Sequence, residues 1–341
     1  MSPVAIVGAA ALGPHGLGWR GLGGLADRGP LCAATLLAAT HPGVHGLEVP
    51  AIAADDDVPP KALRLMSRAA RFAAIVLREA LREAGWTERA GVGYWLGVGA
   101  SGGPLHELVA MLQLARDGDQ VSMERLGREG LLASNPLQSF QVLNNFTMCH
   151  GAILEGTSGP NGALFSRGAG TVHALAEAIH AISDGDCTRA LAGGADTALH
   201  PVTWTELVRD GFAADGLVPS EGAAVLALAD AAATSAPLAF VEYVGVGDPS
   251  ASAPGADAEL VVIAPWGEHA RALLRARAHT GAGTRDVIDA TVQLGEALAA
   301  TPALAWLVAL DRIVSGRARS ACVLSLGPDG ELGTVVLRGP T

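Results

Sequence analysis

Residues 159–174 read GPNGALFSRGAGTVHA, and the local structure that they predict organises the rest of the chain. The Gly-Pro-Asn sequence at their start is typical of a turn. The apolar residues 162–166 then predict a short strand. Residues 172–182 repeat apolar side chains at helical spacing, and an Asp-Gly pair follows as a stop. The stretch therefore predicts a turn, a strand and a helix in close succession, with Gly168 between the strand and the helix.

Strands and helices are predicted to alternate on both sides of this stretch. Further short apolar runs predict strands at residues 4–7, 92–98, 189–192, 223–229, 260–263, 321–326 and 333–337. Apolar side chains at helical spacing predict helices at residues 61–84, 105–114, 268–278 and 287–313, the last with a break near residues 301–302. Such alternation is typical of α/β proteins, in which helices and sheets form layers, and it occurs in both halves of the chain.

The composition is that of a globular protein with an acidic surface. Half of the 341 residues are hydrophobic, 17% are charged, and the formal net charge is −11. Wholesale disorder requires low hydrophobicity, and nucleic-acid binding requires a basic surface, so we expect neither. No apolar run reaches the ~20 residues that span a bilayer, and no basic segment precedes the apolar N-terminus. We therefore expect a cytoplasmic protein with no nucleic-acid or membrane partner.

The cysteines and histidines form no metal-binding pattern. The four cysteines are widely spaced without a CxxC pair, and no histidine pair has HExxH spacing. We therefore expect no metal, no cofactor and no disulfide framework. Residues 8–13 follow a predicted strand, as a dinucleotide-binding loop would, but Pro14 and Gly16 interrupt the helix that should begin there. A structural turn is the favoured interpretation of residues 8–13.

Residues 159–174 resemble the active-site stretch of the β-ketoacyl synthases, in which a Gly-Pro-Asn turn and an apolar strand lead to a nucleophilic cysteine and a long helix. Further segments resemble this family in the same order along the chain. These segments are Val4–Gly8, Ala192–Asp196, Pro219–Ala224 and Phe240–Gly245. The resemblance implies an α/β, thiolase-like fold, with two similar βαβαβ lobes in an α-β-α-β-α layered architecture. We expect an N-terminal lobe with interface and tunnel insertions in residues 1–235, and a shortened C-terminal lobe in residues 236–341.

The catalytic positions of this family are replaced. Gly168 stands where the family has its cysteine, so no thioester can form there. The family's two histidines correspond to Pro265-Trp266 and to Glu296, and its Gly-Phe-Gly-Gly loop to residues 327–330. Two imidazoles would stabilise the enolate formed on decarboxylation, whereas a carboxylate would repel it. The resemblance therefore implies a chain that does not catalyse condensation by itself.

Loss of all three groups resembles the chain-length factors of type II polyketide systems, which lack the cysteine and form heterodimers with an active ketosynthase. Three local features favour this subgroup: residues 139–147, the Ala169-Gly170 pair, and the Pro-Val-Thr-Trp run that ends at Trp204. The subgroup usually has Gln where this chain has Gly168. The short second half resembles the reduced factors associated with polyene products.

The resemblance also implies partners and the surfaces that meet them. The partners would be an active ketosynthase subunit and an acyl carrier protein with a phosphopantetheine-linked chain, which would dock mainly on that subunit because both the carrier and this chain are acidic. In the family, the strand before the nucleophile pairs across the dimer. The expected interface residues are Gly162, Ala163, Leu164, Phe165 and Ser166. The expected tunnel residues are Leu105, Leu108, Leu112, Phe140, Phe146, Met148 and Trp204, of which Phe146 and Trp204 are the favoured gates.

Other functions stay open at this point. The chain could be a structural partner of a ketosynthase with no control of chain length. It could also be a divergent acyl-thioester-condensing enzyme that uses other residues, such as Cys149 and His150. A dinucleotide-binding enzyme is the weakest alternative. Plain core packing is the simplest role of each tunnel candidate taken alone.

Overall fold

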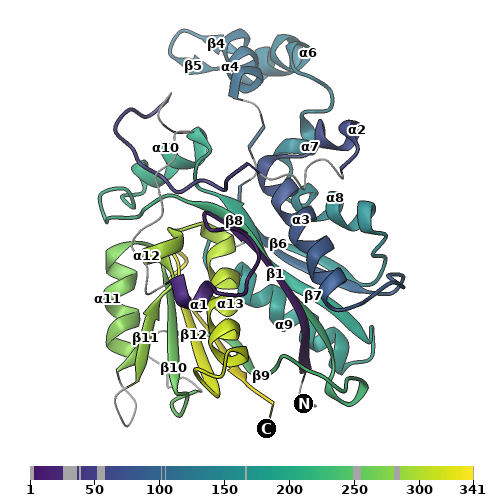
Figure 1. Cartoon of the computed structure of the whole chain (residues 1–341). Helices are drawn as coiled ribbons and strands as arrows, with labels where there is room; N and C mark the ends of the chain where they lie inside the picture. The colour runs from purple at the N-terminus through teal and green to yellow at the C-terminus, as the bar shows by residue number, and fades with distance from the viewer. Residues whose placement is uncertain are drawn as a thin grey trace.

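The computed structural model describes residues 4–25, 37, 40–51, 58–100, 102–103, 105–165, 167–248, 255–279 and 285–340 (Figure 1). Its main feature is an 11-stranded sheet in the order β11-β10-β12-β13-β9-β1-β8-β7-β3-β6, with β2 beside β1. These strands are β1 (Val4–Gly13), β2 (Gly16–Leu17), β3 (Gly93–Val98), β6 (Asn161–Phe165), β7 (Arg189–Thr197), β8 (Glu221–Asp230), β9 (Ala239–Gly247), β10 (Leu260–Pro265), β11 (Asp286–Asp289), β12 (Ser320–Leu326) and β13 (Leu332–Arg338). A separate small ribbon pairs β4 (Arg116–Asp117) with β5 (Gln120–Val121).

Helices lie between most of the strands. They are α1 (Leu22–Leu25), α2 (Pro60–Leu63), α3 (Arg68–Glu83), α4 (Leu105–Leu114), α5 (Met123–Arg125), α6 (Leu131–Ala133), α7 (Ser139–Val142), α8 (Phe146–Glu155), α9 (Gly170–Ser183), α10 (Pro201–Arg209), α11 (Gly267–Ala278), α12 (Thr291–Leu294) and α13 (Thr301–Val314). A π-helical turn spans Leu126–Gly130, and 3₁₀ turns span Ala231–Ala233 and Leu298–Ala300.

The two halves of the large sheet follow one plan. In the first half, β6, β3 and β7 are parallel, and β8 and β1 continue the sheet antiparallel. In the second half, β11, β10 and β12 are parallel, and β13 and β9 continue it antiparallel. The halves join where β1 pairs with β9. This repeated plan is the two-lobed fold expected from the sequence. The predicted boundary at residues 235 and 236 falls between β8 and β9 and stays a prediction.

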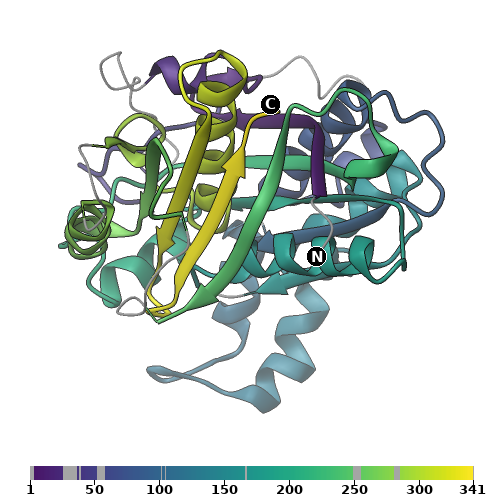
Figure 2. The ribbon, with the colours of Figure 1, turned by 90° about the horizontal axis from the view of Figure 1, so that it is seen from below.

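Two helices occupy the centre of the layers, and others cover the outside (Figures 1 and 2). Alternate residues of a strand point to opposite faces. In β10, Leu260 and Val262 belong to a core cluster with α9 and α13, whereas Val261 and Ile263 pack in a second cluster with α11. On β8, Val225 likewise belongs to a cluster under α3. The order of layers is therefore α-β-α-β-α, as expected.

Three predictions of local structure are wrong. The helix predicted over residues 61–84 is two helices, α2 and α3. The second begins separately because the Ser67 side chain caps its N-terminus by accepting a hydrogen bond from the Ala70 N–H. The first part of the helix predicted over residues 287–313 is the strand β11, which pairs with β10. Residues 8–13 are neither a turn nor a phosphate loop but part of β1. A Cβ at Gly8 would lie 2.7 Å from the Ala84 N, so glycine allows α3 to end against the strand.

Residues 105–133, from α4 to α6, form a projection that we call the arm. Both views show the arm standing away from the layers (Figures 1 and 2). No residue of α4 is buried. Within the described part of the chain, no helix is long and apolar enough to cross a membrane. The described residues also contain no group of three or more His, Cys, Asp and Glu side chains placed to hold a metal ion.

Candidate functional site

Position 168, where the resemblance places the nucleophile, has no room for a side chain. Gly168 lies between β6 and α9 with a φ of +128°, a conformation that residues other than glycine rarely adopt. A Cβ at this position would lie 2.7 Å from the Cα of Gly327 and 2.7 Å from Oδ1 of Asp329. The turn between β12 and β13 therefore closes over position 168, and a cysteine would fit only if that turn moved.

The same turn supplies a carboxylate to the start of α9. Oδ2 of Asp329 accepts a hydrogen bond from the Ala169 N–H at 2.8 Å, and the Asp329 N–H donates to the Arg167 carbonyl at 3.1 Å. The first N–H groups of a helix lack partners in the helix and carry partial positive charge. Asp329 therefore occupies a helix end that would otherwise attract the negative oxygen of a reacting thioester.

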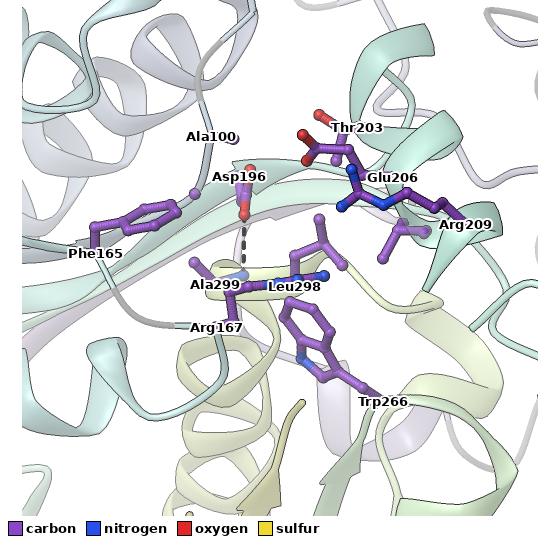
Figure 3. Close-up of a pocket in the computed structure, with 12 residues that line it drawn as sticks. Ala100, Phe165, Arg167, Asp196, Thr203, Glu206, Arg209, Trp266, Leu298 and Ala299 are labelled. Carbon is purple, nitrogen blue, oxygen red and sulfur yellow. Dashed lines mark hydrogen bonds between the residues drawn. The ribbon is translucent and has the colours of Figure 1, made fainter. Parts of the chain in front are cut away.

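A cavity of about 140 Å³ lies in this region (Figure 3). The cavity wall includes residues at or close to all three positions that the resemblance assigns to catalysis. Arg167 precedes Gly168, Trp266 is itself one of the replacements, and Leu298 and Ala299 follow shortly after Glu296. The fold thus gathers three segments that are far apart in the sequence, as the family resemblance requires.

The cavity holds a buried acid but no ketosynthase-type nucleophile. None of the 12 lining residues is a cysteine, histidine or lysine. Asp196 accepts hydrogen bonds from the N–H groups of Thr197 at 2.8 Å and Ala299 at 3.2 Å, the second drawn as the dashed line in Figure 3. Burial raises the pKa of Asp196 to about 7, although these two hydrogen bonds act in the opposite direction. Both oxygens of Asp196 are thus engaged by the backbone, which makes it a structural acid.

Glu296 belongs to a buried ion-pair network and not to the cavity wall. Its Oε2 accepts a hydrogen bond from the Val218 N–H at 2.7 Å, and its Oε1 lies 3.2 Å from Nη2 of Arg271. Arg271 also pairs with Asp289 at 2.8 Å and contacts Glu268. Burial raises the pKa of Glu296 to about 8, and the Arg271 charge opposes this rise. The network ties the segment before α13 to α11, so position 296 has a structural role.

Trp266 lies where the resemblance places the other histidine. Its side chain is buried, and its ring meets the Phe212 ring edge-on with centroids 6.1 Å apart. An indole has no proton to exchange at neutral pH, so it cannot replace an imidazole in catalysis. At the cavity, Arg167 and Arg209 both pair with Asp210, at 2.8 and 3.0 Å. The Arg167–Asp210 pair links the end of α10 to the turn before α9.

Cys149 and His150 lie on α8 and do not line this cavity. Burial raises the pKa of the Cys149 thiol and lowers the pKa of the His150 imidazole, so burial favours the neutral form of each. The His150 ring packs near the rings of Phe146 and Phe140. This arrangement gives no support to a nucleophilic Cys149.

Five of the tunnel candidates lie at or near the surface of the single chain. Leu105, Leu108 and Leu112 share one face of α4 by their spacing, and the Leu112 side chain is 38% exposed. Phe140 and Phe146 meet edge-on with ring centroids 4.7 Å apart. Both rings are half-buried.

The other two tunnel candidates are buried. Met148 packs in the cluster beneath α3. Trp204 packs in a cluster that also contains Trp266 and Leu298, two residues that line the cavity, but Trp204 is not itself among the lining residues. The seven candidates thus have different surroundings in this chain, and a tunnel that includes them stays a prediction.

The expected interface strand is β6, at one edge of the large sheet. Only β3 pairs with it among the described strands. Gly162, Ala163 and Leu164 are half-buried, and the Phe165 side chain is 55% exposed. Ser166 lies outside the described residues.

Asp329, Asp196 and Arg271 were not singled out by the sequence analysis. Asp329 and Asp196 lie within segments that resemble the family, and a carboxylate in a degraded catalytic loop was the available signal for Asp329. No sequence pattern indicated the role of Arg271, because its partners Asp289 and Glu296 lie on other segments of the chain.

Comparisons with known proteins assign the family. The model of the β-ketoacyl synthase N-terminal domain matches residues 53–233, more than half of the chain, and the chain belongs to the β-ketoacyl synthase family. A comparison with curated protein sequences gave no match.

Solved structures with this fold include the ishigamide ketosynthase/chain length factor, with a TM-score of 0.77, 17% identity and 100% of both chains covered. Another is AntDE:AntF, a type II polyketide synthase acyl-carrier protein in complex with its ketosynthase bound to the hexaketide, with a TM-score of 0.76, 14% identity and 99% of both chains covered. A third is a β-ketoacyl synthase from Burkholderia phymatum, with a TM-score of 0.74, 17% identity and 100% of both chains covered. At these identities, the likeness establishes the thiolase-like ketosynthase fold.

Proposed function

We propose that this chain is the non-catalytic, chain-length-determining subunit of a type II polyketide ketosynthase, active only as a heterodimer with a catalytic ketosynthase. The observation that carries the proposal is the closure of position 168 by Gly327 and Asp329. Trp266 and Glu296, in place of two histidines, are consistent with it. A chain with this structure lacks both the thiolate that accepts an acyl group and the imidazoles that assist decarboxylation.

Two surfaces support the pairing. The free edge of β6 presents unpaired backbone groups, which a strand of a second subunit could extend. The arm exposes large apolar side chains, and contiguous exposed apolar surface marks interaction sites. The exposed apolar residues of the arm are Val109, Leu112, Leu114, Val121, Met123, Leu131 and Leu132. The proposed partner is a catalytic ketosynthase, by analogy with the ketosynthase/chain length factor among the structural neighbours.

The acyl carrier protein would dock mainly on that partner, because the charge of −11 on this chain repels an acidic carrier. The growing chain would then reach this subunit through the interface. A large side chain there would stop growth by excluding volume, which outweighs the ~0.8 kcal/mol gained by burying one more methylene. The most specific part of the proposal is that the products are polyenes, and it rests on the short second half of the chain.

Co-expression with a catalytic ketosynthase from the same biosynthetic system tests the proposal. We expect a stable 1:1 complex that condenses acyl thioesters, whereas the chain alone is inert. The matched control is the same ketosynthase with its nucleophilic cysteine changed to alanine, which should bind this chain equally well and give no product. Turnover by the isolated chain would refute the proposal.

A further inference from the structure

A second cavity, of about 440 Å³, lies between the start of α3 and the start of α10. Its volume is in the range of small-molecule sites. The lining divides into an apolar part and a polar part. The apolar side chains are Met66, Leu105, Leu199 and Pro201, and the polar ones are Ser67, Arg68, Arg71, Gln141, Thr197 and His200. Apart from Leu105, the proposed function gives these residues no role.

Arg71 contributes a positive charge that no described carboxylate balances. The neighbouring Arg68 pairs with two carboxylates, those of Glu221 at 2.7 Å and Glu48 at 3.2 Å, which more than offset its charge. Nη2 of Arg71 donates only to the Leu63 carbonyl, at 3.1 Å. Its Nε is buried without a hydrogen-bond partner among the described residues. The lining therefore holds a guanidinium whose charge no described carboxylate balances, in a chain of strongly negative net charge.

The surroundings of Arg71 add positive potential. The start of α3, capped by Ser67, and the start of α10, capped by His200, both border the cavity, and neither helix has an acidic residue in its first turn. Gln138 is buried, and its Nε2 lacks a partner among the described residues. That nitrogen would lie 3.4 Å from a Cβ on Gly103, which lines the cavity. Of the described side-chain donors in these surroundings, the Gln138 Nε2 is the buried one without an acceptor, whereas the side chains of Ser67 and His200 accept from the two helix starts.

We propose that this cavity binds an organic anion with an apolar tail, of the class of medium-chain carboxylates. The head group pairs with Arg71, since a carboxylate accepts the charge-assisted hydrogen bonds that the guanidinium has to offer. The tail packs against Met66, Leu105 and Leu199, which supply the apolar wall. The site belongs to this chain alone, so it is tested without a partner, and its failure would leave the heterodimer proposal untouched.

Octanoate is the probe, measured by calorimetry on the full chain. Octan-1-ol has the apolar tail without the charge, so it measures the contribution of the tail to binding. Inorganic phosphate has negative charge without the tail, so it measures the contribution of the charge. We expect octanoate to bind and Arg71→Gln to weaken it at least about tenfold, because a charge-assisted hydrogen bond is lost. Arg64→Gln is the matched control, since it removes the same charge from an exposed neighbour that does not line the cavity, and it should leave the affinity unchanged.

Three results would overturn the proposal: equal octanoate affinity in wild type and Arg71→Gln, octan-1-ol binding as tightly as octanoate, or phosphate binding as tightly as octanoate. If Arg71→Gln does not fold, Leu105→Glu tests the same claim from α4. The added negative charge must weaken octanoate at least about tenfold. Unchanged octanoate binding in Leu105→Glu would contradict the site equally.

Discussion

The region around position 168 and the arm differ in how much space surrounds their side chains. At Gly168 a single added carbon would collide with the backbone of Gly327. In the arm, by contrast, the Leu132 side chain is 84% exposed and that of Leu131 is 55% exposed. The difference fits the proposed function, in which this chain contributes apolar surface to a heterodimer and no catalytic group.

Gly168→Cys is the strongest test of the closed region. We expect the free energy of unfolding to fall by about 4 kcal/mol, because overpacking against Gly327 and Asp329 adds to the strain of a side chain at positive φ. Urea unfolding measures this loss. The variant should also give no condensation product, since positions 266 and 296 still lack imidazoles.

Gly185→Ala is the matched control for Gly168→Cys. Gly185 also has a positive φ, of +82°, but an added Cβ would meet nothing within 4 Å. We expect a loss of about 1 kcal/mol from strain alone. Adding Asp329→Gly to Gly168→Cys should recover part of the larger loss. Equal losses at positions 168 and 185 would show that the turn does not close the site.

Leu132→Glu tests the open region. A charge at the centre of a proposed apolar interface should weaken binding of the ketosynthase partner about 100-fold, while the stability of this chain changes by less than about 0.5 kcal/mol because the side chain is exposed. The binding of purified subunits measures the effect. Leu273→Glu, at an exposed leucine on α11, is the control and should bind normally. Full binding by Leu132→Glu would exclude the arm from the interface.

Asp196→Asn tests whether the buried acid near position 168 makes the stability of the chain depend on pH. Because burial raises the pKa of Asp196 from 3.8 to about 7, the folded chain keeps a proton that the unfolded chain loses between these values. This contribution to stability is complete below about pH 4 and is lost as the pH rises through 7. When the pH rises from 5 to 8, the free energy of unfolding should therefore fall by about 2 kcal/mol less in the variant than in wild type. Urea unfolding across this range checks the slope, and the exposed Asp184→Asn serves as control.

Leu112→Trp has the smallest expected effect on the free energy of unfolding. It tests whether the arm limits the length of the product. The side chain is partly exposed, so the fold should tolerate the change within about 0.5 kcal/mol. In the active heterodimer we expect shorter products, because the indole fills space that the growing chain would use. Mass spectrometry of the products reads out chain length. Ala110→Trp, on the opposite face of α4, should leave the length unchanged, and an unchanged length in both variants would favour a purely structural subunit.

Local patterns predicted much of the secondary structure. The helix expected over residues 105–114 is α4, and the one expected over residues 172–182 is α9 with one or two more residues at each end. The helix predicted over residues 287–313 is wrong at residues 287–289, because apolar spacing over so few residues cannot distinguish a helix from a strand, and the pairing with β10 makes these residues part of β11.

The candidate site was only partly visible in the sequence. Loss of the cysteine at position 168 could be inferred from one residue, whereas its closure depends on the turn that carries Asp329. The family resemblance places Glu296 where a histidine is expected, and this stays a prediction. The pairing of Glu296 with Arg271 on α11 could not be predicted from the sequence.

The sequence by itself determined which residues stand at the positions that the resemblance assigns to catalysis, the family that the chain resembles and the order of most of its elements, because these depend on residue identity and local periodicity. Only the tertiary structure decided that position 168 is closed, that the arm is exposed and that Arg71 lines a cavity without a described carboxylate partner. These properties depend on distances between segments remote in the chain. Such distances are set when the two halves of the sheet pack around α9 and α13.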